Sequence, residues 1–119
     1  MSTKTILGAL ALAAGASAAE WRLAETYDKT NFFDKFDFFT GADPTFGHVN
    51  YRTRADATEM GLVGVDGDDV FMKPETSSVV GDEGRSSVRI ESKVEYDYGL
   101  FIARFSKVPT PTCGVWPAL

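Results

Sequence analysis

Residues 88–96 read Val-Arg-Ile-Glu-Ser-Lys-Val-Glu-Tyr, and this alternation decides the expected fold class. The apolar side chains Val88, Ile90, Val94 and Tyr96 share one parity, and charged side chains occupy the other. Successive side chains of a β-strand point to opposite faces of a sheet, so a period of two indicates a strand with one buried face. We therefore predict one half-buried strand here.

Turn signals divide the remaining chain into short segments rich in β-forming residues. We expect strands near residues 36–39, 49–51 and 70–73, and a helical turn within residues 52–60. Residues 100–105 are almost entirely apolar, which predicts a deeply buried strand paired antiparallel to residues 88–96 through a turn at residues 97–99. Short strands separated by turns are typical of an all-β, antiparallel sandwich.

The first 19 residues have the features of a secretory signal peptide. Lys4 gives a short basic start, an apolar run extends from Ile6 to Ala14, and Ala16-Ser17-Ala18 fits a cleavage site. The run is shorter than the roughly 20 apolar residues that a membrane span needs. We expect residues 1–19 to be removed, the product to be secreted and extracellular, and residues 20–119 to form the folded part.

The charge balance narrows the class of partner. Twelve basic and seventeen acidic residues give a formal net charge of −5. Nucleic acid and anionic membrane surfaces attract basic proteins, so we expect neither as a partner. A neutral polysaccharide is compatible with this balance, and no obligate protein partner and no cofactor are inferred.

Three blocks in order along the chain resemble glycoside hydrolase family 16, in its secreted fungal type. They are residues 27–39 followed by Asp43-Pro44-Thr45 and Val49-Asn50-Tyr51; residues 84–93; and residues 98–105 followed by Pro109 and residues 114–118. The resemblance implies a concanavalin-like jelly roll and a retaining endo-β-1,3(4)-glucanase acting on β-glucan of the cell-wall, laminarin or lichenan type.

The resemblance also implies where the catalytic carboxylates lie. In the family, a Glu-x-Asp-x-x-Glu or Glu-x-Asp-x-Glu strand follows the Trp-Pro-Ala sequence, which here is residues 116–118, close to the end at Leu119. We therefore expect residues 20–119 to be the N-terminal part of the domain, an incomplete sandwich without catalytic residues and inactive alone. Glu91, Glu95 and Asp97 share parity, but they alternate with basic residues and lead into a turn, which favours a solvated charged face.

Three residues are candidates for substrate binding. Arg89 matches the arginine that the family's Arg-x-x-Ser-Lys block implies as a sugar contact, and its five donors suit hydroxyl groups; an ion pair with Glu91 or Glu95 is the alternative. Trp116 could stack on a sugar ring or pack in the core. Tyr98 could line a cleft or serve as a hairpin residue.

Other chemistry-bearing residues carry weaker signals. Asp66, Asp68 and Asp69 favour a turn over a calcium loop, because their spacing departs from the EF-hand pattern. Cys113 is the only cysteine; it either pairs with a partner elsewhere or is buried as a small apolar residue. We predict no metal site.

Two other functional classes stay open from the sequence. One is a noncatalytic glucan-binding or wall-associated β-sandwich, and the other is a truncated product without a function of its own.

Overall fold

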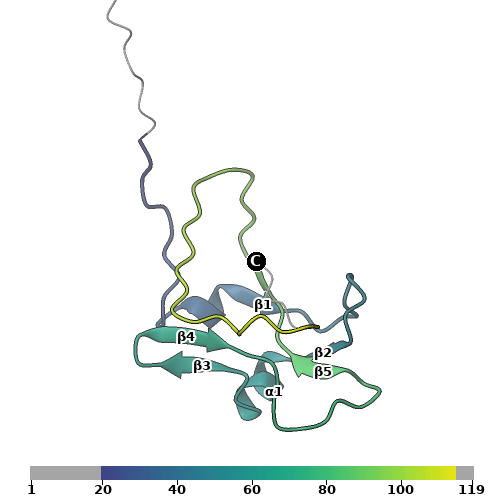
Figure 1. The fold of residues 1–119 in the computed structure, drawn as a ribbon. Helices are drawn as coiled ribbons and strands as arrows, with labels where there is room; N and C mark the ends of the chain where they lie inside the picture. Colours follow the sequence, from purple (N-terminus) through teal and green to yellow (C-terminus); the bar gives the residue numbers. More distant parts are fainter. Residues whose placement is uncertain (1–19, 115–119) are drawn as a thin grey trace, which may run out of the picture.

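The computed structural model describes residues 20–114, which form three short strand pairs with one α-helix at their side (Figure 1). The elements in chain order are η1 (Phe32–Asp34), β1 (Phe36–Phe38), β2 (Val49–Tyr51), α1 (Arg54–Glu59), β3 (Val63–Asp66), β4 (Asp69–Met72), β5 (Arg85–Ser87) and β6 (Ile90–Ser92). The strands expected near residues 36–39, 49–51 and 70–73 are confirmed to within a residue, and so is the helical turn.

Two of the three strand pairs are antiparallel, and the third is parallel. β1 pairs antiparallel with β6 and β3 with β4, whereas β2 runs parallel to β5 with Tyr51 opposite Ser87. A parallel pair needs a long connection, and here α1 and the β3–β4 hairpin supply it. The expectation of purely antiparallel pairing is therefore wrong for β2 and β5.

The helix α1 and the chain that leads from it into β3 form the small core. The Thr53 side chain caps α1 by accepting a hydrogen bond from the Asp56 N–H, and Gly61 follows the helix in the left-handed region at φ 65°. Ala57, Leu62 and Val63 are buried, and three partly buried apolar residues pack against them: Phe33, Phe38 and Val88.

The hairpin of β3 and β4 turns at Gly67, which has φ 61° and so suits a residue without a side chain. The turn at residues 66–68 was expected, but β3 was not. Gly64 lowers the strand propensity of β3, and the structure explains its presence. A Cβ atom at Gly64 would lie 2.8 Å from the Phe71 ring, so the glycine makes room for that ring.

The single strand predicted over residues 88–96 is wrong, because within this span only Ile90–Ser92 forms a strand, β6. β5 ends at Ser87 where it leaves β2, and β6 begins at Ile90 where it joins β1. After Ser92 the chain leaves the sheet, and Val94 and Tyr96 are exposed. The alternation of half-buried and exposed side chains therefore holds only from Ile90 to Ser92.

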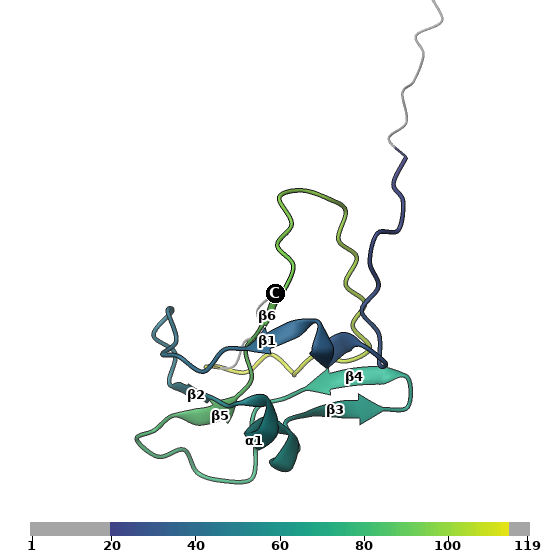
Figure 2. The ribbon, with the colours of Figure 1, turned by 180° about the vertical axis from the view of Figure 1, so that it is seen from behind.

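The strand predicted over residues 100–105 is also absent from the described part of the chain. The segment after β6 rises away from the strands and returns as a long loop, as both views show (Figures 1 and 2). Its large apolar side chains are exposed, including Phe101 and Ile102. Apolar composition alone does not make a strand, since a ladder needs a neighbouring backbone; the predicted antiparallel hairpin does not form.

Candidate functional site

Arg89 lies between β5 and β6, where its backbone is tied to the chain after β1. The carbonyl of Arg89 accepts a hydrogen bond of 3.0 Å from the Phe39 N–H. Its guanidinium lies 4.6 Å from the centroid of the Phe39 ring and pairs with the Glu91 carboxylate, with Nη2 3.0 Å and Nε 3.2 Å from Oε1. A cation over an aromatic face and beside a carboxylate is held in one orientation.

Tyr51, on β2, is a second aromatic residue near Arg89, and it packs against Phe39. Its ring meets Phe39 edge-on, with the centroids 5.8 Å apart. Burial raises the pKa of the Tyr51 phenol, the negative charge of Asp43 raises it further, and the positive charge of Arg89 opposes them. The phenol is therefore neutral at physiological pH and can both donate and accept a hydrogen bond.

Asp43 anchors the loop between β1 and β2. Its carboxylate accepts hydrogen bonds of 2.8 Å from the Thr45 hydroxyl and 2.8 Å from the Gly47 N–H. The Thr45 hydroxyl is the main cause of the lowered pKa of Asp43, so this carboxylate stays ionised. We call Arg89, Phe39, Tyr51, Asp43 and Glu91 the Arg89 cluster.

The Arg89 cluster offers the chemistry that a neutral, hydroxyl-rich ligand requires. It combines a fixed guanidinium, a neutral phenol and carboxylate acceptors beside aromatic rings. The Glu91 carboxylate contacts only part of the Arg89 guanidinium, and the Arg89 side chain is 35% exposed. The remaining N–H donors of the guanidinium can therefore reach a ligand. The ion pair with Glu91, which the sequence left as an alternative, does form; the substrate contact stays a prediction.

The other two candidates do not join this cluster in the described structure. Tyr98 is 89% exposed on the long segment that follows β6. Trp116 lies outside the described residues. Phe39, Tyr51 and Asp43 belong to the sequence blocks that carry the family resemblance, but they were not predicted as site residues; only their place in the same set of blocks as Arg89 hinted at it.

The three acidic residues with shared parity do not lie along one strand. Glu91 is in β6 and pairs with Arg89, while Glu95 and Asp97 follow the end of β6 and are exposed. The absence of catalytic residues from this chain stays a prediction.

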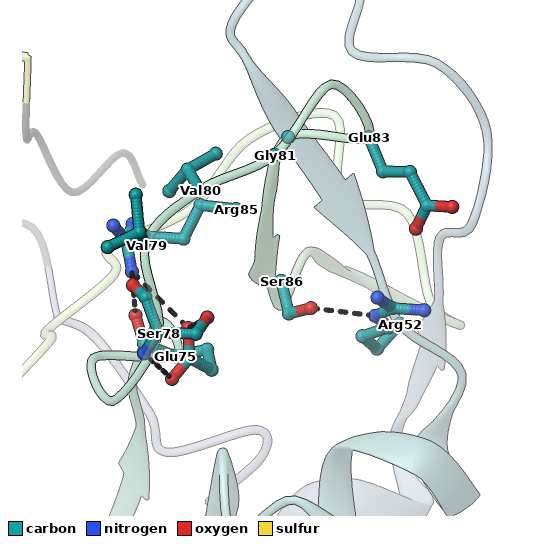
Figure 3. A pocket seen from close by; sticks show the side chains of 10 residues that line it. Arg52, Glu75, Ser78, Val79, Val80, Gly81, Glu83, Arg85 and Ser86 are labelled. Carbon is teal, nitrogen blue, oxygen red and sulfur yellow. Dashed lines mark hydrogen bonds and ion pairs between the residues drawn. The ribbon is translucent and has the colours of Figure 1, made fainter.

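A second polar group lines an open pocket of about 220 Å³ beside β5 (Figure 3). Arg85 donates to the Glu75 carbonyl at 2.7 Å and pairs with its carboxylate at 3.3 Å, and Arg52 Nε donates to Ser86 Oγ at 3.0 Å. Hydrogen bonds from the Ser77 and Ser78 side chains lower the pKa of Glu75 to about 2. The first two contacts join the loop before β5 to Arg85, and the third joins β5 to Arg52, the residue after β2.

The described residues offer neither a metal site nor a membrane-spanning helix. Between residues 20 and 114, no three His, Cys, Asp or Glu side chains gather closely enough to hold a metal ion. The helix in this part of the chain is too short to cross a membrane. Cys113 is an exposed free thiol, so of the two alternatives the buried apolar cysteine is wrong, and a partner for Cys113 stays a prediction.

Comparison with protein families and curated proteins gives matches along most of the chain. A family model described as "XgeA-like, catalytic GH16 domain" matches residues 36–119. The chain is 40% identical over 113 residues to an endo-1,3(4)-beta-glucanase of Arthroderma benhamiae, covering 95% of this chain and 24% of that protein. A probable glycosidase of Schizosaccharomyces pombe is 36% identical over 101 residues, or 85% of this chain and 24% of that protein. The chain thus spans about a quarter of the length of these relatives.

The chain is also similar in fold to solved structures of family 16 proteins. An elongating GH family 16 β-1,3-glucosyltransferase is 35% identical with a TM-score of 0.64, over 67% of this chain and 28% of that one. Laminarinase 16A from Phanerochaete chrysosporium, solved with β-glucans in donor and acceptor sites, is 31% identical with a TM-score of 0.57, over 61% and 25%. These similarities confirm the predicted β-sandwich of the jelly-roll type.

Proposed function

Since this chain belongs to glycoside hydrolase family 16, we propose that it is the N-terminal part of the catalytic domain of a retaining endo-β-1,3(4)-glucanase. This enzyme would hydrolyse O-glycosyl bonds in β-glucans of the cell-wall, laminarin or lichenan type. The relatives named as endo-1,3(4)-beta-glucanases and the laminarinase solved with β-glucans support this substrate class.

The Arg89 cluster carries the proposal, because it presents fixed donors to a neutral sugar. The guanidinium is oriented by the Phe39 ring and the Glu91 carboxylate before a ligand arrives. Preorganised donors bind hydroxyl groups without the entropic cost of ordering a long side chain. Arg89 is therefore proposed to orient one sugar residue by its hydroxyls, with Tyr98 and Trp116 as proposed further contacts.

Hydrolysis with retention needs two carboxyl groups about 5 to 5.5 Å apart, one as nucleophile and one as acid and base. We propose that residues 20–119 supply glucan contacts and not this pair, so that the chain alone is inactive. The state of the local carboxylates supports this, because Glu91 is committed to Arg89, and Glu95 and Asp97 lie beyond the strand.

The test uses the full chain and two readouts. Affinity electrophoresis in gels containing laminarin measures binding, and release of reducing ends from laminarin and lichenan measures hydrolysis. We expect binding without hydrolysis. Arg89→Ala removes charge-assisted hydrogen bonds worth about 1.5 to 3 kcal/mol, so binding should weaken by about tenfold or more.

A matched control is Arg54→Ala, which removes another surface arginine paired with a carboxylate, Asp34, at 2.8 Å. Its binding should equal that of the unmodified chain. Equal losses in both variants would contradict the proposed role of Arg89, and hydrolysis by the chain alone would contradict its inactivity. Binding without hydrolysis by a protein that carries the complete domain would instead indicate a noncatalytic glucan-binding sandwich, and a chain that neither folds nor binds would indicate a truncated product.

We propose further that the protein is exported. The basic residue, apolar run and cleavage site within residues 1–19 support secretion. N-terminal sequencing of the protein recovered from culture medium should find a start near Ala19 or Glu20; retention of Met1 on extracellular protein would contradict the cleavage.

A further inference from the structure

Phe46 combines two features that do not favour stability. It lies in the loop between β1 and β2 with φ 60°, in the left-handed region where the Cβ of a bulky residue crowds the backbone. Its side chain is also 96% exposed, so the ring gains almost nothing from burial. A bulky residue held in an unfavourable conformation, with its ring in solvent, calls for a functional explanation.

The loop fixes the position of Phe46. The Phe46 N–H donates to the Asp43 carbonyl at 3.0 Å, and the Asp43 carboxylate accepts from the Gly47 N–H at 2.8 Å. A Cβ atom at Gly47 would lie 2.5 Å from the Asp43 carboxylate, so a side chain there would have to displace that carboxylate. The ring is thus presented by an ordered turn.

This turn is attached to the Arg89 cluster at two points. At its start, Gly41 lies against the Phe39 ring so closely that a Cβ atom there would be 2.7 Å from Cζ. The second point is Asp43, which belongs to both the turn and the cluster and whose charge acts on Tyr51. The loop stands beside the start of β2 in both ribbon views (Figures 1 and 2).

We propose that Phe46 is a stacking platform for one glucosyl ring of a β-glucan chain that also contacts the Arg89 cluster. This inference rests on the proposed glucan-binding function and adds a residue that sets affinity. β-Linked glucose carries its hydroxyls equatorially, so the ring faces expose C–H groups that pack on an aromatic surface. An exposed and preorganised phenylalanine supplies that surface at a low entropic cost.

Phe46→Asn separates a binding role from a structural one. Asparagine tolerates the left-handed region, so the full chain should unfold in urea at the same or a higher concentration. Its laminarin binding in affinity electrophoresis should weaken by about tenfold, or about 1.4 kcal/mol. Phe46→Trp keeps an aromatic face and should retain binding.

Val79→Ala is the matched control, because Val79 is equally exposed at 96% on another loop. It should leave binding unchanged. If Phe46→Asn binds laminarin as the unmodified chain does while Arg89→Ala does not, this inference is wrong and the proposed function stands. If the unmodified chain does not bind laminarin, the proposed function fails and this inference with it.

Discussion

Replacing Gly84 with alanine tests whether the parallel pairing of β2 and β5 supports the Arg89 cluster. Gly84 has φ 82°, and a Cβ atom there would lie 2.8 Å from the backbone of His48 and Val49. The left-handed conformation alone costs an alanine about 1 kcal/mol. Because backbone atoms block the methyl group, the strands must also separate.

Separation removes hydrogen bonds between the strands, beginning with the bond of 3.0 Å from the Arg85 N–H to the His48 carbonyl. The loss of about two bonds at about 1 kcal/mol each, added to the conformational cost of about 1 kcal/mol, gives a total destabilisation of about 3 kcal/mol. With a urea dependence of about 1.5 kcal/mol per molar, the midpoint of unfolding should fall by about 2 M. If the unmodified chain is stable by less than about 3 kcal/mol, Gly84→Ala should be unfolded even without urea and should lack the native circular dichroism spectrum.

Two other glycines provide controls. Gly61 has φ 65°, and no atom lies within 4 Å of the place that an added methyl group would occupy, so Gly61→Ala should cost only the conformational term of about 1 kcal/mol. Gly81 has neither constraint, and Gly81→Ala should be neutral or stabilising by about 0.5 kcal/mol. Equal midpoints for Gly84→Ala and Gly81→Ala would refute the reasoning, as would unchanged laminarin binding by an unfolded Gly84→Ala chain.

Three further predictions concern groups outside this strand pair. A hydrogen bond of 2.7 Å to Tyr96 is the main reason that the pKa of Tyr27 is raised to about 12. The stability that this hydrogen bond contributes is therefore present below pH 10 and lost as the pH rises towards 12. Phenolate absorbance should show Tyr27 titrating late, and Tyr96→Phe should move this titration to a lower pH. The pKa of Glu75 is lowered to about 2, so the stability that its carboxylate contributes is present above pH 4.5 and lost as the pH falls towards 2. The urea midpoints of the unmodified chain and of Glu75→Gln should therefore differ at neutral pH and converge in acid. Leu62→Ala should destabilise the chain by about 3 kcal/mol in urea unfolding, because Leu62 is buried in a small core; a loss below about 1 kcal/mol would contradict that core assignment.

The sequence predicted those parts of the fold that depend on neighbours in the chain. The turn at Gly67, the strand at Val49–Tyr51 and the helical turn at Arg54–Glu59 follow from local propensity and turn chemistry. It did not predict which strands pair, because pairing depends on residues far apart. The restriction of the strand within residues 88–96 to Ile90–Ser92 and the exposure of residues 100–105 are failures of this kind.

The candidate site shows the same limit. Arg89 was identified from its motif, and its contact with Glu91 two residues later was foreseen as an alternative. Phe39 and Tyr51 come from distant segments, and only the pairing of β1 with β6 and β2 with β5 brings them beside the guanidinium. The exposed ring of Phe46 could not be recognised either, because its backbone conformation has no signature in composition.

The strand pairs are nested within one another, which has a consequence for folding. The β3–β4 hairpin lies inside the loop that β2 and β5 close, and that loop lies inside the one closed by β1 and β6. Loop closure costs more entropy as the loop lengthens, so the hairpin closes most easily and each inner pair shortens the loop left for the next. Arg89, located where the two outer pairs meet, reaches its final surroundings only at the last of these closures.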